Sequence, residues 1–225
     1  MFCRTARSQN VTLKWPQQPA SQPKPQAKPN SQQSSALIDR RPLAGSIVGH
    51  TYTNKFFDFS IAFPEEWVVV FVNQGPQSDK KGVVYFLLLV GGLDKRTNGT
   101  RWITIAAARP PGSSMSKKTA ENAVEGVANS LNLMASMGLD KGFRLIGKRT
   151  EMLLGGTRMS RLQFDAEVES QGSSYDTRVS QFALVEHGYM LFFLSSDPVN
   201  HESDPESATK ALDSLHFGKS HTSPQ

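Results

Sequence analysis

The stretch Tyr52–Trp67, with the sequence YTNKFFDFSIAFPEEW, predicts the opening strands of a β-sheet. Large apolar side chains stand at every second position from Phe57 to Phe63, with smaller or polar residues between them. This period of two is typical of a strand with one buried face. Pro64 cannot donate a backbone hydrogen bond to a neighbouring strand, so we expect the strand to end there. The stretch contains no reactive motif, and it therefore indicates architecture rather than activity.

Seven further segments have strand character, and several of them must form an antiparallel meander. The run Val83–Val90 is apolar on both faces, which predicts a central strand covered from both sides. Tight turns at Gln171-Gly172 and at His187-Gly188 join strands that then run antiparallel. The predicted strands are Trp67–Val72, Val83–Val90, Trp102–Ala108, Phe143–Leu154, Leu162–Val168, Tyr175–Val185 and Tyr189–Leu194.

Two segments have helical spacing. The first carries one apolar stripe, and Ser114 or Ser116 can cap its start while Gly138 suits its end. The second has Ser203 and Glu206 at the spacing of a capping box, with Pro205 in the first turn. The stripes are Ala120, Val124, Val127, Leu131 and Met134 in the first helix, and Ala208, Ala211, Leu212 and Leu215 in the second.

The order of these elements predicts an α+β fold, in which an antiparallel β-sheet is flanked by helices. We assign residues 46–218 to this domain and expect 219–225 to be a frayed C-terminus. Residues 1–45 are predicted to form a disordered tail. Its segment Pro16–Ser35 contains no large apolar side chain whose burial would offset the entropy of ordering. Its prolines make it a semi-extended spacer.

The positive charge of the chain is concentrated in this tail. Up to Gly45 there are seven basic residues and one acid, which gives +6, whereas the whole chain carries +5. The remainder is near neutral, which argues against a dedicated nucleic-acid surface. No apolar run approaches the length of about 20 residues that a membrane span needs, and no apolar core follows Arg4 and Arg7 as in an export signal. We expect membrane association only through the tail, or through an anchor upstream of this sequence.

Motifs with established chemistry give little support to catalysis. Gly142–Lys148 has the spacing of a phosphate-binding loop, but Arg149 follows where that motif needs Ser or Thr. The five histidines include no i, i+4 pair, and there is no nucleophile elbow. The single cysteine, Cys3, leaves no intrachain disulfide and no cysteine metal site. We therefore expect a protein that is not an enzyme and that uses no cofactor or metal.

The chain resembles the PsbP/Mog-type family from about Tyr52 to Phe217. The matching motifs are the aromatic-rich opening with Pro64-Glu65-Glu66-Trp67, the turn Leu153-Leu154-Gly155-Gly156, the pair Gly188-Tyr189, and the closing Leu212-Asp213-Ser214-Leu215-His216-Phe217. They are structural motifs, so the resemblance implies a fold, an α/β/α sandwich, more directly than an activity. Most members are not enzymes, which implies a binding or assembly module. Luminal and envelope proteins are among them, which favours an extracytoplasmic location at the cell envelope.

We predict a module that binds a protein partner through two loops. The segments Asn73–Lys81 and Gly91–Arg101 flank the central strand and are long enough to carry a binding surface. An alternative from another class is a small-molecule or lipid carrier, with a pocket between the sheet and the Ala120–Met134 helix. The sequence leaves the partner and the oligomeric state open. The residues expected to contact the partner are Asn73, Gln77, Asp79, Lys80, Asp94, Lys95 and Arg96.

Overall fold

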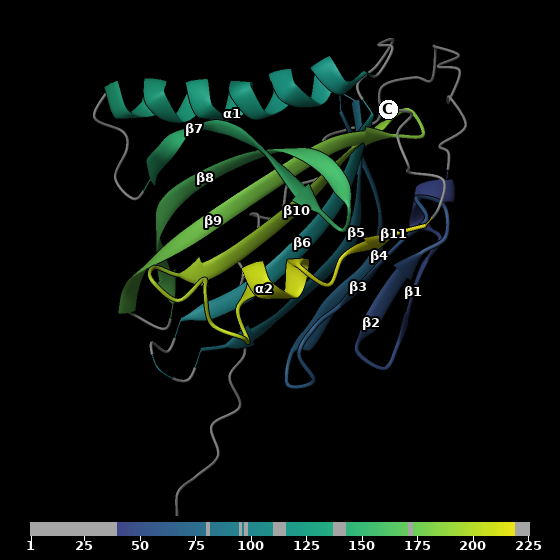
Figure 1. The fold of residues 1–225 in the computed structure, drawn as a ribbon, viewed down its shortest axis with the longest axis horizontal. Coiled ribbons are helices and arrows are strands. Elements are labelled where there is room, and N and C mark those ends of the chain that lie inside the picture. The colour runs from purple at the N-terminus through teal and green to yellow at the C-terminus, as the bar shows by residue number, and fades with distance from the viewer. Residues whose placement is uncertain are drawn as a thin grey trace, which may run out of the picture. The chain divides into compact units, whose positions relative to one another are not determined.

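Two antiparallel sheets make up most of the described chain (Figure 1). The computed structural model describes residues 40–79, 82–94, 96, 99–109, 116–136, 143–170 and 173–218. The predicted tail up to residue 39 and the predicted frayed end, 219–225, lie outside them. A short 3-10 helix, η1 (Arg41–Leu43), buries Pro42. Folded structure therefore begins before the predicted domain start at residue 46.

The larger sheet has seven strands, each antiparallel to its neighbours, with β4 and β7 at its edges. The predicted strand Phe143–Leu154 is confirmed with the same bounds, and the other predicted strands of this sheet are confirmed with longer ones. In spatial order the strands are β4 (Val68–Asp79), β5 (Gly82–Leu93), β6 (Thr100–Arg109), β10 (Tyr189–Pro198), β9 (Ser173–Glu186), β8 (Thr157–Ser170) and β7 (Phe143–Leu154).

The smaller sheet joins the first strands of the domain to the last. Phe217 pairs with Phe59, and the N–H of Gly218 donates to the carbonyl of Asp58 at 2.8 Å. The alternation predicted between Phe57 and Phe63 is confirmed, because the four large residues at its odd positions are all buried. The strands, in spatial order, are β1 (Gly45–Val48), β2 (Thr51–Asn54), β3 (Phe59–Ala62) and β11 (His216–Phe217).

The two faces of the larger sheet are covered by different elements. On β9, Phe182 and Leu184 lie in the main apolar core, whereas Ala183 and Val185 lie in a smaller cluster under α1 (Lys117–Ser136). Successive residues of a strand point to opposite faces, so α1 and the main core lie on opposite sides of the sheet. We call these sides the α1 face and the core face. The smaller sheet and α2 (Ala208–Leu212) close the core face.

The predicted antiparallel β architecture is therefore confirmed, and the described chain is mainly strand with few helices. The layer on the core face is mostly a four-stranded sheet, and α2 adds only five residues of helix to it. No helix among the described residues is both long enough and apolar enough to cross a membrane.

The first predicted helix is confirmed as α1. The backbone N–H groups of Thr119 and Ala120 donate to the carbonyl of Ser116, and the Ser116 N–H donates back to the Thr119 hydroxyl at 3.1 Å. This reciprocal arrangement satisfies groups that an uncapped helix start would leave open. Ala120 and Val124 of the predicted stripe are buried. The other stripe residues, Val127, Leu131 and Met134, have side chains outside the described set.

The second predicted helix begins later than the sequence indicated. Ser207, rather than Ser203, occupies the N-cap, and its hydroxyl accepts a hydrogen bond from the Lys210 N–H at 3.0 Å. The prediction from the Ser203–Glu206 spacing was wrong because the chain from His201 to Ser207 forms successive turns instead. The apolar residues of the predicted stripe do contact the core, and Ala208, Leu212 and Leu215 are buried there.

A β-bulge explains why the run Val83–Val90 is so apolar. Phe86 pairs with Ala106 and Leu88 pairs with Ile105, so Leu87 is an extra residue in β5. A bulge shifts the alternation by one, and Leu87 and Leu88 therefore both reach the main core with no exposed area. On the other face Val84, Phe86 and Leu89 are only half-buried. This strand was predicted to be buried on both faces, but only its side chains on the core face are fully buried.

The turn between β7 and β8 offers a matched pair of glycines for a stability test. Gly155 and Gly156 both have positive φ, +58° and +78°, but only at Gly155 would an added Cβ meet another atom, the Leu215 carbonyl oxygen at 2.3 Å. We expect Gly156→Ala to cost about 1 kcal/mol through backbone strain alone, and Gly155→Ala to cost clearly more. Urea unfolding measures both. Equal costs would contradict the close approach of Leu215.

Candidate functional site

The first group of predicted partner-binding residues lies in a strand rather than in a loop. Asn73, Gln77 and Asp79 belong to β4, and Lys80 lies outside the described residues. The sequence NQGPQSD is polar and contains Gly and Pro, which favours a loop. Pairing with β5 nevertheless continues to Asp79, because an irregularity between Gln74 and Gln77 accommodates the Gly-Pro pair. The loop assignment was therefore wrong, whereas a role in binding stays a prediction.

Asn73 holds β4 against the smaller sheet. Its backbone has a φ of +52°, and its side-chain amide donates to the Gly45 carbonyl at 2.6 Å. The hydroxyl of the buried Tyr52 donates to the side-chain amide oxygen of Asn73 at 3.4 Å, and burial raises the pKa of this phenol to about 12. Asn73 therefore acts as a structural link between β1 and β4, with its side chain half-buried.

The start of β4 carries exposed apolar side chains. Val68 and Val70 are 67% and 54% exposed, and Val69 is also exposed. Leu93 at the end of β5 is exposed too, two residues beyond Gly91, which pairs with Val68. β4 is an edge strand of the larger sheet. We call Val68, Val69, Val70 and Leu93 the valine edge. Gln77, one of the predicted contact residues, lies near the other end of β4 and is not part of the valine edge.

The second group of predicted residues is divided between surface and interior. Arg96 is exposed, Asp94 is buried, and Lys95 lies outside the described residues. The loop is closed by the Asp94 N–H, which donates to the Gly99 carbonyl at 2.8 Å, and by the Arg96 N–H, which donates to the Asp94 carboxylate at 2.9 Å. Asp94 is therefore a structural residue, and of this group Arg96 can reach a partner.

Asp94 belongs to an ionic cluster that joins two loops. The buried Arg101 contacts Asp94 at 2.9 Å and Asp204 at 2.8 Å, and Arg96 also contacts Asp204. The His201 Nδ1 lies 3.3 Å from Asp204 and 3.9 Å from Asp94. Asp94 precedes β6, and Asp204 lies between β10 and α2. The cluster therefore ties the β5–β6 loop to the segment that leads into α2.

Asp94, His201 and Asp204 place possible ligand atoms within 4.8 Å of one another, which raises the question of a metal ion. The two carboxylates are already neutralised by Arg96 and Arg101. A divalent cation at the same place would be repelled by both guanidinium groups. The residues therefore fit an ion-pair network better than a metal site.

A row of alternating charges crosses the larger sheet on the core face. Arg144 of β7 stands opposite Asp165 of β8, Asp165 opposite Arg178 of β9, and Arg178 opposite Asp197 of β10. The Asp165 carboxylate receives hydrogen bonds from Arg144 at 2.5 Å and from Arg178 at 2.8 Å. Opposite charges directly across antiparallel strands stabilise the pairing. We call these four residues the charge row.

Asp197 at the end of the charge row is fully buried. Its carboxylate accepts the backbone N–H of Ala208 at 2.6 Å, the N–H of Thr209 at 2.9 Å and the Thr209 hydroxyl at 2.8 Å. Burial raises the pKa of Asp197 even though these donors and the charge of Arg101 lower it. The first turn of α2 is therefore fixed to the last residues of β10.

The pKa values of Asp94 and Asp165 are lowered, whereas that of Asp197 is raised. Burial alone would raise the pKa of each carboxyl, but the Arg178 and Arg144 hydrogen bonds lower that of Asp165. The Arg96 N–H and the charge of Arg101 lower the pKa of Asp94. A carboxyl whose pKa is lower in the folded than in the unfolded protein stabilises the fold at any pH above its unfolded-state pKa. This stabilisation is lost as the pH falls through the folded-state pKa. Asp197 has the opposite effect on the pH dependence of stability, because its carboxylate binds a proton more readily in the folded than in the unfolded protein.

Sequence reasoning missed the charge row, although part of its signal was visible. Gln163, Asp165 and Glu167 alternate with apolar residues in β8, and such alternation usually marks a solvent face. Asp165 is instead buried between two arginines. Its partners lie on other strands and become neighbours only once the register of the sheet is known.

Comparisons with known proteins concern the fold. No family model and no curated protein matched the chain. A similar solved structure is the solution structure of cyanobacterial PsbP (CyanoP) from Synechocystis, with 14% identity, a TM-score of 0.45, and coverage of 76% of this chain and 94% of that one. PsbP, the family named from the sequence, is thus among the structural neighbours, and the resemblance holds at the level of fold.

Two other similar structures come from other bacteria. One is the crystal structure of LpqN, involved in cell envelope biogenesis of Mycobacterium tuberculosis, with 14% identity, a TM-score of 0.36, and coverage of 71% of this chain and 82% of that one. The other is a crystal structure from Bacteroides thetaiotaomicron, with 10% identity, a TM-score of 0.41, and coverage of 77% and 50%. Similarities this distant describe the path of the chain and carry no argument about function.

The charge row predicts a measurable loss of stability in the variant Asp165→Asn. The neutral amide leaves Arg144 and Arg178 without the carboxylate between them, and we expect unfolding in urea to require about 2 kcal/mol less free energy. Asp213→Asn is the matched control, because Asp213 is half exposed and pairs with Lys210 at 3.6 Å. The control should change stability by less than about 0.5 kcal/mol. Equal effects would show that the charge row does not stabilise the sheet.

The depressed pKa values of Asp94 and Asp165 predict acid sensitivity. The stability of the wild-type protein should fall as the pH drops below the ordinary aspartate value of 3.8. In Asp165→Asn the same fall should be shallower, because one of the linked carboxyls is absent. Urea midpoints between about pH 5 and pH 2 measure the two slopes. Identical slopes would contradict the assignment to Asp165.

Proposed function

We propose that this protein is a non-enzymatic binding module that acts through a protein partner at the cell envelope. The observation that carries the proposal is the valine edge, a group of exposed apolar side chains on an edge strand. Envelope location and the absence of catalysis rest on the PsbP/Mog-type resemblance of the sequence. The finer description of the fold as an α/β/α sandwich belongs to the same proposal, with α1 on one face and α2 on the other.

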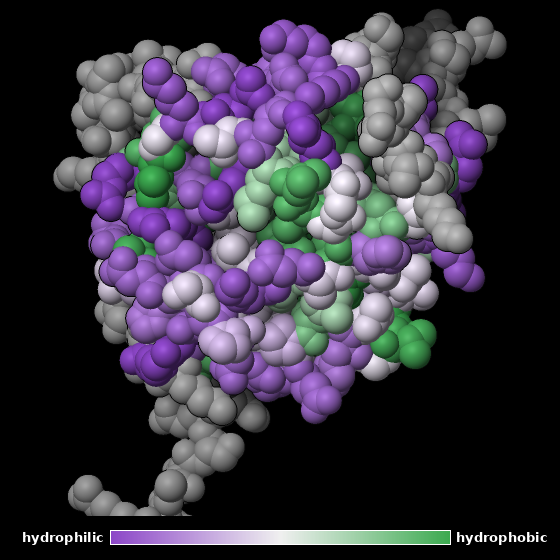
Figure 2. Space-filling view, viewed as in Figure 1, coloured by the Kyte–Doolittle hydropathy of each residue, from purple (hydrophilic) through white to green (hydrophobic). Residues whose placement is uncertain are grey.

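An edge strand is a natural place for a partner to bind. Its outer backbone groups can pair with an added strand, and natural proteins usually protect such edges with charged side chains or proline. Three consecutive valines at the start of β4 do the opposite, because they present apolar surface and favour extended structure. Figure 2 shows that other apolar side chains also reach the surface in small areas among polar ones, so the argument rests on the place of the valines on an edge.

The surroundings of the valine edge are rigid. Asn73 holds the middle of β4 against β1, and the Arg101–Asp94 ion pair fixes the loop that follows β5. A surface that is already ordered loses less entropy when a partner binds. Arg96, one of the predicted contact residues, lies on this loop and is exposed. The predicted partner surface is thereby moved from two loops to an edge strand and the loop beside it.

The carrier alternative lacks a comparable observation. Ala120 and Val124 of α1 pack directly against Leu162 and Ala183 of the sheet. Leu145, Val185 and Phe192 surround this cluster. The described part of the interface between α1 and the sheet is therefore filled by the protein's own side chains, which favours the partner module over a carrier with its pocket there.

The test is a pull-down from the source cells with the full chain as bait, followed by mass spectrometry of the bound proteins. We expect a stoichiometric partner with the wild-type protein and loss of most of it with Val70→Lys, because a charge at the edge opposes strand addition. Val70 is more than half exposed, so the variant should fold with near-normal stability.

Leu153→Lys is the matched control. Leu153 is 64% exposed and lies on β7, the opposite edge of the same sheet. This variant should retain the partner. Equal loss in both variants would point to general hydrophobic adhesion, and absence of any stoichiometric protein from the wild-type sample would overturn the proposal.

A further inference from the structure

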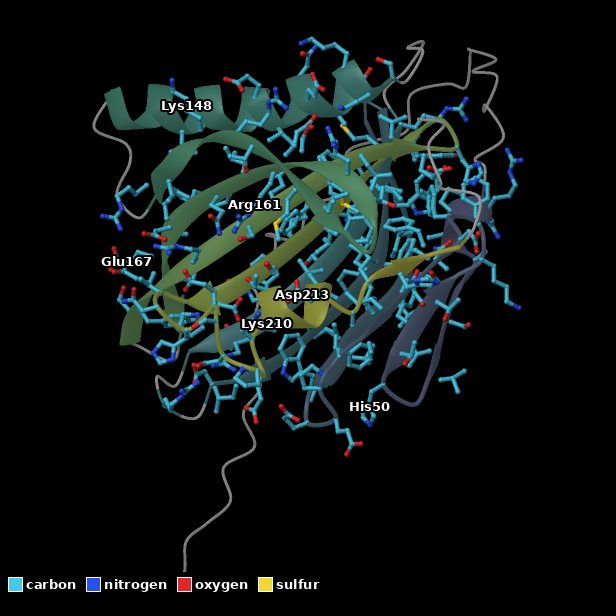
Figure 3. The ribbon with its side chains drawn as sticks, in the orientation of Figure 1. His50, Lys148, Arg161, Glu167, Lys210 and Asp213 are labelled. Carbon is cyan, nitrogen blue, oxygen red and sulfur yellow. The ribbon has the colours of Figure 1, made fainter. Side chains whose placement is uncertain are left out.

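Next to the charge row lies an arginine that does not belong to it. Arg161 stands opposite Thr150 of β7 and Phe182 of β9, on the core face of β8. Its guanidinium lies 5.8 Å above the centre of the Phe182 ring, and its Nε is buried without a hydrogen-bond partner among the described residues. Figure 3 shows Arg161 over β8 and β9, with Lys210 of α2 and Asp213, which follows α2, lower in the same view.

The carboxylates around Arg161 are engaged by other groups. Asp165 pairs with Arg144 and with Arg178 at 2.8 Å, and Glu202 pairs with Arg178 at 2.6 Å. Asp197, opposite Arg178, accepts hydrogen bonds from the first turn of α2. Burial lowers the pKa of Arg161, the charge of Glu202 raises it and that of Arg178 lowers it.

Two unsatisfied atoms of opposite kind remain in this corner. The Arg161 Nε lacks an acceptor, and the buried Glu202 Oε2 lacks a donor, among the described residues. Buried polar groups are almost always hydrogen-bonded, and leaving them unpaired is costly. A ligand that offers an anionic acceptor and an N–H donor would satisfy both atoms.

We propose that Arg161 is the anchor of a binding site for a peptide carboxylate, on the core face of β8 and β9. A guanidinium matches a carboxylate in shape, because both are planar and can form two parallel hydrogen bonds. Arg161 offers one positive charge, which matches one carboxylate, whereas a dianionic phosphate would be repelled more strongly by Glu202 and Asp165. Phe182 supplies a flat apolar floor under the guanidinium.

The groups beside Arg161 are ordered for such a role. Gln163 donates to the Ser180 hydroxyl at 2.9 Å, and Ser195 and Thr209 place their hydroxyls 3.3 Å apart on the next strand and on α2. These residues keep the side of the site toward the charge row polar, while Phe182 and Phe193 form its apolar side. This site adds to the proposed function, because it implies that the partner carries a carboxylate. That the partner is a protein rests on the proposed function.

The test is a titration of the full chain with N-acetylglycine, which has one carboxylate and one N–H, followed by the NMR signals of arginine Nε–H groups. We expect saturable shifts of the Arg161 signal. In Arg161→Gln the affinity should fall by about tenfold or more, the loss expected for a charge-assisted hydrogen bond. Arg158→Gln is the matched control, because Arg158 lies on the same strand but pairs with Glu151, and it should bind as the wild type does.

Acetate has the carboxylate without the N–H, so comparing it with N-acetylglycine distinguishes a peptide carboxylate from a free small acid. Weaker binding of acetate supports a peptide group, and equal binding keeps the carboxylate site but assigns it to free small acids. Absence of saturation, or equal loss in Arg161→Gln and Arg158→Gln, overturns the site. Val70→Lys should leave N-acetylglycine binding unchanged, so failure of the valine edge and failure of this site are distinguishable.

A second variant tests whether Arg161 is merely structural. Arg161→Met removes a half-buried charge that forms no ion pair with the described residues, and it keeps an unbranched apolar side chain over Phe182. The melting temperature should therefore stay equal or rise. A fall in melting temperature greater than that of Arg158→Met would show that Arg161 stabilises the fold, and would overturn the reasoning that it is kept for a ligand.

Discussion

A carboxylate without exposed area determines how the chain closes on itself. Asp197 ends β10 inside the protein, and a buried charge is stable only when hydrogen bonds or opposite charges surround it. The N–H groups of Ala208 and Thr209 meet this need, and they can do so only if the chain turns back over the core face. That return places Leu212, Leu215 and Phe217 in the main core. The closing segment therefore depends on one polar contact, although apolar burial supplies most of its stability.

The core face changes its chemistry along the direction of the strands. The charge row lies at one end, hydroxyl and amide groups follow at Gln163, Ser180 and Ser195, and aromatic side chains come next at Phe182 and Phe193. Because the strands are in register, each kind of side chain forms a band across several strands. The sheet thus holds a dry core and a polar corner on the same face, and Arg161 lies at the boundary between them.

The sequence predicted the parts of this fold that depend on local patterns. Alternation from Phe57 to Phe63 and the stripe with Ala120 and Val124 were enough to find β3 and α1, because each pattern repeats within one element. β4 was cut short because polar residues with Gly and Pro resemble a loop, and only pairing with β5 reveals the strand. α2 was started too early because a capping-box spacing does not show whether the turns before Ser207 continue as helix.

The candidate sites were harder to predict, because their residues come from distant parts of the chain. Arg144, Asp165 and Arg178 are close enough in sequence for a hairpin to suggest their pairing, but Asp197 completes the charge row from another strand. Arg161 stood just before the predicted strand Leu162–Val168 and belonged to no pattern. The role of Arg161 depends on which groups its neighbours are bonded to, and a pattern of residue types in the sequence does not show this.

The pairing of β11 with β3 has a consequence for how the protein is made. Phe59 leaves the ribosome more than a hundred residues before its partner Phe217, so one side of β3 has no strand to pair with during most of synthesis. Nascent chains of this kind cannot complete their core while translation continues, because the last apolar side chains are still missing. The smaller sheet is therefore completed only after the last residues of the domain have been synthesised, and until then its apolar side chains are available to a chaperone.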